Sequence, residues 1–210
     1  ARCGAHGAMS RPAPGQPCPV STYRLQMGPQ LTFDEAAAVA PRLAALGVSH
    51  VYLSPILASA PGSTHGYDVV DPTRIDEEMG GREGFERFVA ACRGAGLGIV
   101  LDIVPNHVAT PVPAHLNPSW WGLLSDGEES EYASWFDVDH DAHDGRVLVP
   151  ILGGTPQEAI DNGELVIDRE GGPGGTPVLR YHEHVLPVRP ETLDLPLPEL
   201  VEAQPYRLAF

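Results

Sequence analysis

Gly98-Ile-Val-Leu-Asp-Ile-Val-Pro-Asn-His107 is the stretch of this chain that decides its fold. The apolar, β-branched run from Ile99 to Val104 predicts a buried strand, which the following proline ends. Three polar side chains gather at the carboxyl end of that strand, namely Asp102, Asn106 and His107. In a parallel α/β barrel, the carboxyl ends of the strands carry the catalytic residues. The alternative is an ordinary strand end with a helix-capping asparagine and a hydrogen-bonded histidine.

Upstream of this stretch, strand and helix signals alternate. Residues 20–26 alternate in polarity as a strand does, and residues 48–54 form a second segment of the same kind. Between them, Thr32-Phe-Asp-Glu35 is a capping box that opens an alanine-rich helix, and Gly47 ends it. Pro41 inside this helix predicts a kink or a late start.

A second helix is predicted after a long loop that reaches about Gly80. Its apolar positions recur at helical spacing, and two glycines end it before the strand that opens at Ile99. The order β-α-β-α-β implies parallel strands joined by crossover helices. The apolar face of this helix consists of Phe85, Phe88, Val89 and Cys92.

Regular periodicity covers residues 20–104 and then disappears. The long irregular region 105–210 predicts a separate small domain or a lid, whereas residues 1–19, rich in Ala, Gly, Pro and Arg, predict a disordered tail. Three parallel strands leave an open edge and cannot close a barrel, so we expect the chain to be a fragment of a longer protein. Short strands are predicted near 146–151, 164–168 and 178–188.

Composition excludes some classes of partner. The net charge of −15 over 210 residues repels phosphate backbones and anionic lipids, which makes nucleic acids and membrane surfaces poor partners. No apolar run approaches the length of a membrane span. The odd number of cysteines, none at metal-ligand or redox spacing, makes a reducing cytoplasm the expected compartment. These cysteines are Cys3, Cys18 and Cys92.

A second polar cluster follows the second predicted strand, within Gly62-Ser-Thr-His-Gly-Tyr-Asp-Val-Val-Asp-Pro72. His65, Tyr67 and Asp68 again fall at the carboxyl side of a strand. A tyrosine there can stack on a sugar ring, while histidine and aspartate can hydrogen-bond its hydroxyls. The alternative is a loop held by turn-forming residues. Because two such clusters follow consecutive strands, we favour a functional role for His65 and Tyr67.

These two clusters resemble the α-amylase superfamily, glycoside hydrolase family 13. Asp102-Ile-Val-Pro-Asn-His107 is similar to the first signature region of the superfamily, and His65-Gly-Tyr67 is similar to its second-strand loop. Within the superfamily, the flanking segments resemble the maltooligosyltrehalose synthase family. Those segments are 21–26, 52–57, 62–72, 120–121, 145–153 and 205–209.

The resemblance implies an α/β fold, with the first three strands of a (β/α)₈ TIM barrel and a B domain inserted after the third strand. It implies a retaining double displacement without a cofactor, in which one carboxylate attacks the anomeric carbon and a second carboxyl group protonates the leaving oxygen. The substrate would be a maltooligosaccharide whose reducing-end α-1,4 linkage becomes α,α-1,1, as in trehalose biosynthesis, with a trehalose-releasing hydrolase acting next. The alternatives are another hydrolase or transferase of the superfamily, or a non-catalytic carbohydrate-binding fragment.

The resemblance also implies roles for individual residues. His107 would hydrogen-bond the sugar in the −1 subsite, Tyr67 would stack beneath that sugar, and His65 would lie nearby. Asp102, the candidate catalytic residue, would orient the arginine that precedes the nucleophile. The remaining substrate-binding candidates are Asp68, Asn106, Trp120 and Trp121, the two tryptophans being equally compatible with a sugar-stacking wall and with core packing.

Two expected features are absent from the sequence. No Gly-x-Arg-x-Asp segment occurs between Pro105 and Phe210, and the family's nucleophile, acid and transition-state-stabilising carboxylates follow later strands, so we expect the chain alone to be inactive. We assign no metal. In many amylases the asparagine that corresponds to Asn106 ligates calcium. The other ligands of that calcium site are not recognisable in this sequence. His182 and His184 would share one face of a strand, yet no third ligand lies nearby.

Overall fold

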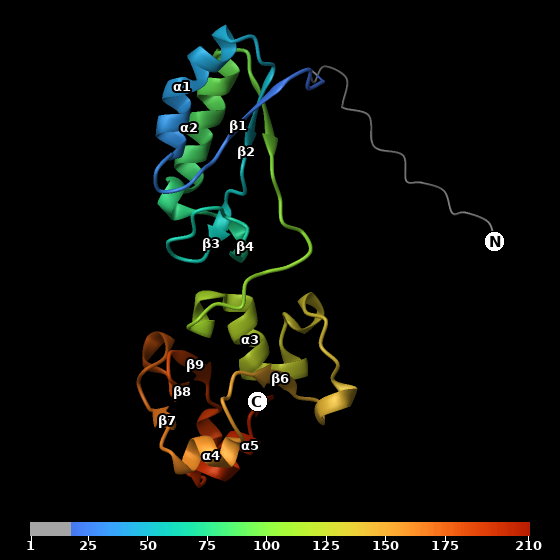
Figure 1. The fold of residues 1–210 in the computed structure, drawn as a ribbon, viewed down its shortest axis with the longest axis vertical. Coiled ribbons are helices and arrows are strands. Elements are labelled where there is room, and N and C mark those ends of the chain that lie inside the picture. The colour runs from blue at the N-terminus through green and yellow to red at the C-terminus, as the bar shows by residue number, and fades with distance from the viewer. Residues whose placement is uncertain (1–17) are drawn as a thin grey trace, which may run out of the picture. The chain divides into compact units, whose positions relative to one another are not determined.

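The computed structural model describes residues 18–210, which form two compact units (Figure 1). The predicted disordered tail over residues 1–19 therefore lies almost entirely outside the described residues. Of the described residues, the first unit contains 18–57, 62–67 and 74–105. The second unit contains residues 58–61, 68–73 and 106–210.

A parallel sheet of three strands forms the first unit. Its strands are β1 (Thr22–Leu25), β2 (His50–Leu53) and β5 (Gly98–Leu101), in the order β1-β2-β5. Both ladders are parallel, which confirms the strand direction predicted from the β-α-β-α-β pattern. The third strand is shorter than predicted, so Asp102 directly follows it instead of lying within it.

Two helices, α1 (Phe33–Ala45) and α2 (Gly81–Gly94), pack together with the apolar side of this sheet. The predicted capping box is present, because Thr32 and Glu35 each accept a hydrogen bond from the other's backbone N–H. The helix begins directly after this cap and continues through Pro41, so the late start was wrong. Its fully buried side chains include Phe33, Ala36 and Ala40, and those of α2 include Phe88 and Cys92.

The segment between β2 and α2 is more regular than the predicted loop. Strands β3 (Leu57–Ser59) and β4 (Val69–Ile75) form a two-stranded sheet, followed by a 3₁₀ turn over Glu77–Met79. Pro72 within β4 argues against a strand in the sequence, since proline cannot donate to a ladder. A strand with one hydrogen-bonded neighbour tolerates this missing donor, and the pairing with β3 is not visible in local periodicity.

The second unit also contains more secondary structure than predicted. A three-stranded antiparallel sheet has the order β7 (Leu165–Asp168), β8 (Val178–Tyr181), β9 (His184–Pro187). Strand β6 (Val147–Pro150) pairs in parallel with β10 (Tyr206–Ala209). Among the described residues, every helix is too short or too polar to cross a bilayer. The α-helices of this unit are α3 (Pro118–Asp126), α4 (Pro156–Asp161) and α5 (Leu197–Glu202). Short 3₁₀ turns cover Ala114–Leu116, Gly127–Glu129, Ala133–Trp135, Asp141–His143, Pro173–Gly175 and Pro190–Thr192.

The single strand predicted over residues 178–188 is wrong. The chain turns back between β8 and β9, with Tyr181 paired to His184 in the antiparallel register. His182 lies in this turn with a φ of 51°, which is a left-handed conformation outside the extended region. The turn interrupts the side-chain alternation of a strand, so His182 and His184 do not share a strand face.

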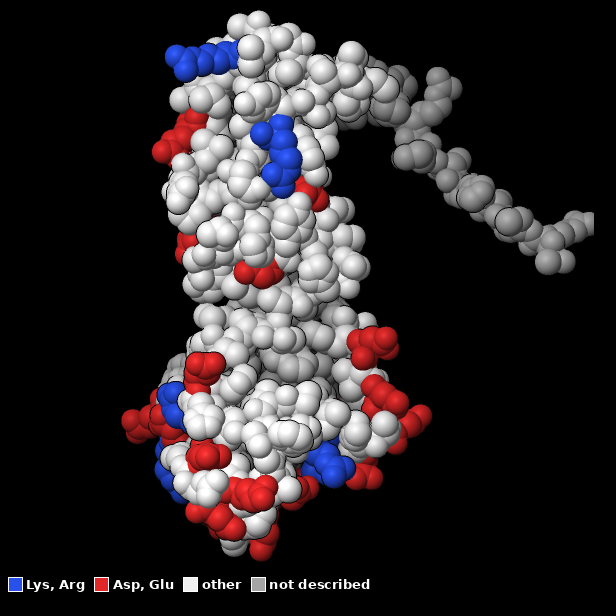
Figure 2. Space-filling view, viewed as in Figure 1, with Lys and Arg blue, Asp and Glu red and all other residues white. Residues whose placement is uncertain are grey.

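The second unit is built around its own apolar core and carries an acidic surface. Leu123 and Leu124 of α3, Leu179 of β8 and Tyr206 of β10 are completely buried in one cluster. Figure 2 shows acidic side chains spread over the visible face of this unit, with few basic ones between them. Such a surface repels anionic polymers.

Candidate functional site

Strand alternation directs polar side chains of the first unit to one face of the parallel sheet. Val51 and Leu53 are fully buried in the core shared with the helices, so Tyr52 between them points to the opposite face. Arg24 is the register partner of Tyr52 on β1. Asp102 follows β5 at the same end of the sheet and reaches Tyr52 directly. The parallel register therefore assembles a polar row at the carboxyl ends of the strands.

Asp102 is the acceptor at which this row converges. The Tyr52 hydroxyl donates to Asp102 Oδ2 over 3.0 Å, and the Tyr67 hydroxyl donates to the same oxygen over 2.5 Å. The hydrogen bond to Asp102 raises the pKa of Tyr52 above its usual range. Phenol-to-carboxylate hydrogen bonds of this kind are charge-assisted and short. Two of the residues predicted to be functional, Tyr67 and Asp102, are therefore in direct contact.

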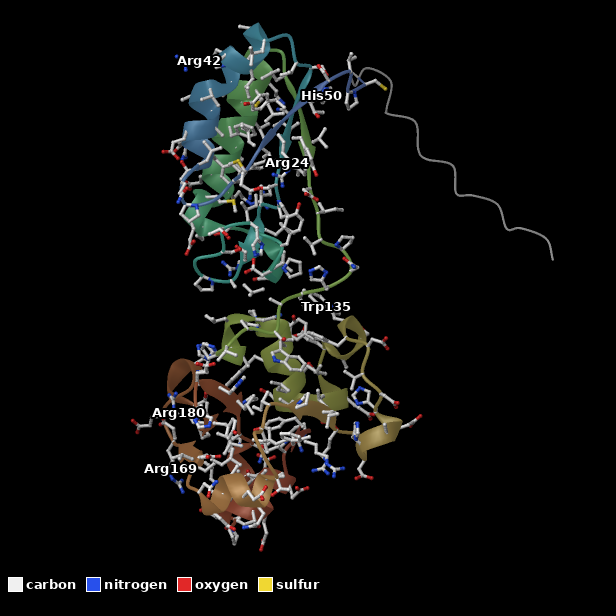
Figure 3. The ribbon with its side chains drawn as sticks, in the orientation of Figure 1. Arg24, Arg42, His50, Trp135, Arg169 and Arg180 are labelled. Carbon is white, nitrogen blue, oxygen red and sulfur yellow. The ribbon has the colours of Figure 1, made fainter. Side chains whose placement is uncertain are left out.

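Arg24 provides the positive charge of the network (Figure 3). Its Nη2 donates to the Tyr67 hydroxyl over 3.4 Å, and its Nη1 donates to Gln26 Oε1 over 2.8 Å. The guanidinium carbon lies 5.7 Å from the centre of the Tyr52 ring, within the range of a cation–π contact. The hydrogen bond to Tyr67 raises the pKa of Arg24 further above its ordinary value.

Gln26 links the sheet to the loop that carries Tyr67. Its Nε2 donates to Ser54 Oγ over 3.3 Å and lies 3.3 Å and 3.5 Å from the carbonyl oxygens of Thr64 and His65. The Tyr67 backbone N–H donates to His65 Nδ1 over 3.0 Å. A backbone N–H can only donate, so His65 Nδ1 is the acceptor of this hydrogen bond.

Gly66 is needed for the same loop to reach this conformation. Its φ of +75° lies in the left-handed region, and a Cβ there would lie 2.7 Å from the Pro55 carbonyl oxygen. The loop therefore approaches the backbone after β2 more closely than any other residue type allows. This approach sets the position of Tyr67, the next residue along the chain.

The other predicted site residues belong to the second unit. The Asp68 carbonyl oxygen accepts the Ala60 N–H over 3.0 Å. Asn106 and His107 are both exposed, and Asn106 Oδ1 lies 3.3 Å from His107 Nδ1. These side chains are thus accessible within their unit, and their predicted roles stay predictions.

Trp120 and Trp121 lie on α3 and are half-buried against the core of the second unit. The ring of Trp120 is 5.6 Å from that of Phe136, and the ring of Trp121 is 5.7 Å from that of His115. These aromatic contacts favour core packing over a sugar-stacking wall for both tryptophans.

Sequence reasoning missed three members of the network, namely Arg24, Gln26 and Tyr52. The available signal was the position of Arg24 and Gln26 two residues apart on a predicted strand, which places both on one face. Within residues 18–210, no group of three or more His, Cys, Asp or Glu side chains is arranged to hold a metal ion. The arrangement instead offers aromatic and hydrogen-bonding groups suited to an uncharged polar ligand.

Parallel strands joined by helices, with polar side chains at their carboxyl ends, define the class of α/β catalytic domains. The family model described as "Alpha amylase, catalytic domain" matches residues 41–155, more than half of the chain. The chain therefore belongs to the α-amylase catalytic-domain family.

Individual relatives narrow the similarity within this family. The chain is 42% identical over 194 residues to a putative maltooligosyl trehalose synthase of Mycobacterium tuberculosis, which covers 90% of this chain and 24% of the relative. The solved structure of maltooligosyltrehalose synthase from Arthrobacter ramosus is 40% identical with a TM-score of 0.79, covering 91% of this chain and 24% of that one. Intracellular maltogenic amylase of Bacillus subtilis is 38% identical over 93 residues, or 44% of this chain and 15% of the relative. The predicted resemblance to the synthases is confirmed, and the chain spans about a quarter of their length.

Proposed function

We propose that this chain is the amino-terminal part of a maltooligosyltrehalose synthase, acting in intramolecular transglucosylation on maltooligosaccharides. The observation that carries the proposal is the similarity to two synthases along nine-tenths of the chain. In this proposal, residues 20–104 form the first β-α-β-α-β part of the barrel. Residues 105–210 form the domain inserted after its third strand.

Tyr67 is proposed to support the sugar whose anomeric carbon reacts. Tyr67 is 39% exposed, so part of its side chain is accessible to a ligand while the hydroxyl is held by Asp102 and Arg24. The His65 ring lies 6.0 Å from it at an angle of 30° and extends the same aromatic surface. An aromatic face fixed at its polar tip fits the apolar side of a pyranose ring.

Asp102 is proposed to orient an arginine supplied by a later barrel strand. Both side-chain hydrogen bonds that it accepts in the described residues end on Oδ2. Oδ1 is therefore the oxygen that offers an acceptor to a further donor, and a guanidinium is the donor best suited to a fixed carboxylate. The nucleophile and the general acid are proposed to come from the same later strands, so the chain alone would not catalyse the reaction.

His107, Asn106 and Asp68 are proposed to hydrogen-bond sugar hydroxyls of the substrate. All three side chains carry groups able to bind an uncharged polyol. A malto-oligosyltrehalose trehalohydrolase from a Rhizobium species is 34% identical over 120 residues of this chain. An enzyme of that activity is the proposed partner that would release trehalose from the product.

A chimeric enzyme tests the proposed function. Residues 18–210 replace the matching segment of the Arthrobacter ramosus synthase, and the protein is incubated with maltopentaose. We expect reducing ends to disappear with little free glucose, because the reducing-end linkage becomes non-reducing. The Asp102→Asn chimera is the matched control, in which we expect activity to fall at least a hundredfold, as for the loss of an orienting group. A folded parent chimera without activity would contradict the proposal.

Hydrolysis by another member of the family is the second candidate. The similarity to the Bacillus subtilis maltogenic amylase supports it, but that similarity extends over 44% of the chain against 90% for the synthase. In the same assay, a hydrolase would increase the number of reducing ends. A non-catalytic carbohydrate-binding fragment would instead leave maltopentaose unchanged.

A further inference from the structure

Arg24 occupies an unusual position for an arginine, because its partners are neutral. Its guanidinium donates to the Tyr67 hydroxyl and the Gln26 amide oxygen and lies over the Tyr52 ring. Among residues 18–210, no carboxylate lies within ion-pair distance of it. Its guanidinium is therefore directed at the Tyr67 hydroxyl, which links it to the Asp102 carboxylate without a direct ion pair.

The hydrogen-bonding chemistry of arginine fixes the proton of Tyr67. A guanidinium has donors only, so Arg24 must occupy a lone pair of the phenolic oxygen. The single proton of that oxygen then points to Asp102, which accepts it over 2.5 Å. Two partners of one hydroxyl, a donor and an acceptor, fix the orientation of Tyr67 more firmly than either partner alone.

The same logic extends through Gln26 to the loop. Because Arg24 donates to Gln26 Oε1, the amide NH₂ of Gln26 must point away from it. That NH₂ lies beside the carbonyl oxygens of Thr64 and His65. Arg24 thus orients two neutral acceptors, the Tyr67 hydroxyl and the Gln26 amide oxygen. The Gln26 amide in turn holds the backbone just before Tyr67.

We propose that Arg24 is a positioning residue for the transglucosylation, acting through Tyr67 and through Gln26. This inference rests on the proposed function. A sugar that flattens at its anomeric carbon needs its stacking partner at one height and one tilt, and small misplacements near a reacting centre cost large factors in rate. Loss of Arg24 therefore lowers kcat more than it raises KM.

The test uses the chimeric full-length enzyme described above. We expect Arg24→Met to lower kcat about tenfold, with KM changed less than about twofold. Arg24→Lys restores part of the loss, because an ammonium can donate to Tyr67 or to Gln26 but lacks the planar fork that reaches both. Arg42→Met is the matched control, since Arg42 is an exposed arginine on α1 (Figure 3), and we expect its kcat to stay within about twofold of the parent.

A double-mutant cycle with Tyr67→Phe separates positioning from a general structural effect. Without the Tyr67 hydroxyl, Arg24 has lost one of its two acceptors, so we expect Arg24→Met to cost less than about threefold in the Tyr67→Phe enzyme. If the losses of kcat caused by Arg24→Met and by Tyr67→Phe multiply fully in the double variant, the proposal is overturned. An effect of Arg24→Met on KM alone would overturn it as well. If Arg24→Met unfolds the enzyme, the same cycle is run with Arg24→Lys.

Failure of this inference is distinguishable from failure of the proposed function. A parent chimera that creates reducing ends would refute the synthase activity. The coupling between Arg24 and Tyr67 would still be measured on that hydrolysis, since both reactions share the sugar in contact with Tyr67. If the chimera is an active synthase and the effects of Arg24→Met and Tyr67→Phe on kcat are independent, only the proposed role of Arg24 is refuted, and the proposed function stands.

Discussion

Replacing Gly66 with alanine tests the claim that this loop positions Tyr67 through its close approach to the backbone. The substitution has two costs. The φ of +75° is left-handed, which costs an L-residue about 1–2 kcal/mol. The new Cβ would also lie 2.7 Å from the Pro55 carbonyl oxygen, a backbone atom that cannot rotate away, and such overpacking costs about 1–3 kcal/mol. Together they amount to roughly 2–5 kcal/mol.

Gly62→Ala is the matched control for this prediction. Gly62 has a φ of +77°, but a Cβ there would meet no atom within 4 Å, so only the conformational cost applies. In the chimeric enzyme, hydrogen exchange of the Tyr67 amide reports opening of the loop, because this N–H is bonded to His65. We expect exchange to be at least about tenfold faster in Gly66→Ala than in Gly62→Ala, together with a lower kcat. Equal exchange in the two variants would refute the argument.

Three further predictions concern packing and protonation. Phe88→Ala should lower the free energy of unfolding by about 3–5 kcal/mol, because Phe88 is completely buried between the helices and the sheet; a change below about 1 kcal/mol in a urea titration would contradict this. The hydrogen bond to Asp102 raises the pKa of Tyr52 in the folded state, so this contribution to stability is present below the unfolded pKa of about 10 and is lost as the pH rises through the folded value. The phenolate absorbance of the parent and the Tyr52→Phe variant should therefore differ only at a pH above about 10. A difference that begins at a lower pH would argue against the hydrogen bond. Burial raises the pKa of Cys92 to about 11, whereas Cys18 is exposed, so iodoacetamide at pH 8 should label Cys18 and spare Cys92 in peptide mapping; equal labelling of both thiols would disprove the buried position.

Local signals in the sequence were sufficient for the main elements of the first unit. The capping box at Thr32 and Glu35 and the helical spacing of Phe88 and Cys92 each act within a few residues of the chain, and both helices are present. Asp102 and Tyr67 were found because they follow apolar strands as short polar motifs. Their contact could be expected, because parallel strands end at the same edge of a sheet.

Other features depended on partners that are distant in sequence. The contact between Arg24 and Tyr67 joins residues 43 positions apart, and it requires both the β1–β2 register and the return of the loop through Gly66. The turn at His182 likewise divides one apolar run into two strands. Periodicity reports which face a side chain occupies, but it carries no information on which distant donor or acceptor meets it there. The sequence by itself therefore determined the parallel β-α framework and the two polar motifs that carry Tyr67 and Asp102. Only the tertiary structure decided that Arg24, from the first strand, completes the site, because that contact depends on strand register and on the path of a distant loop.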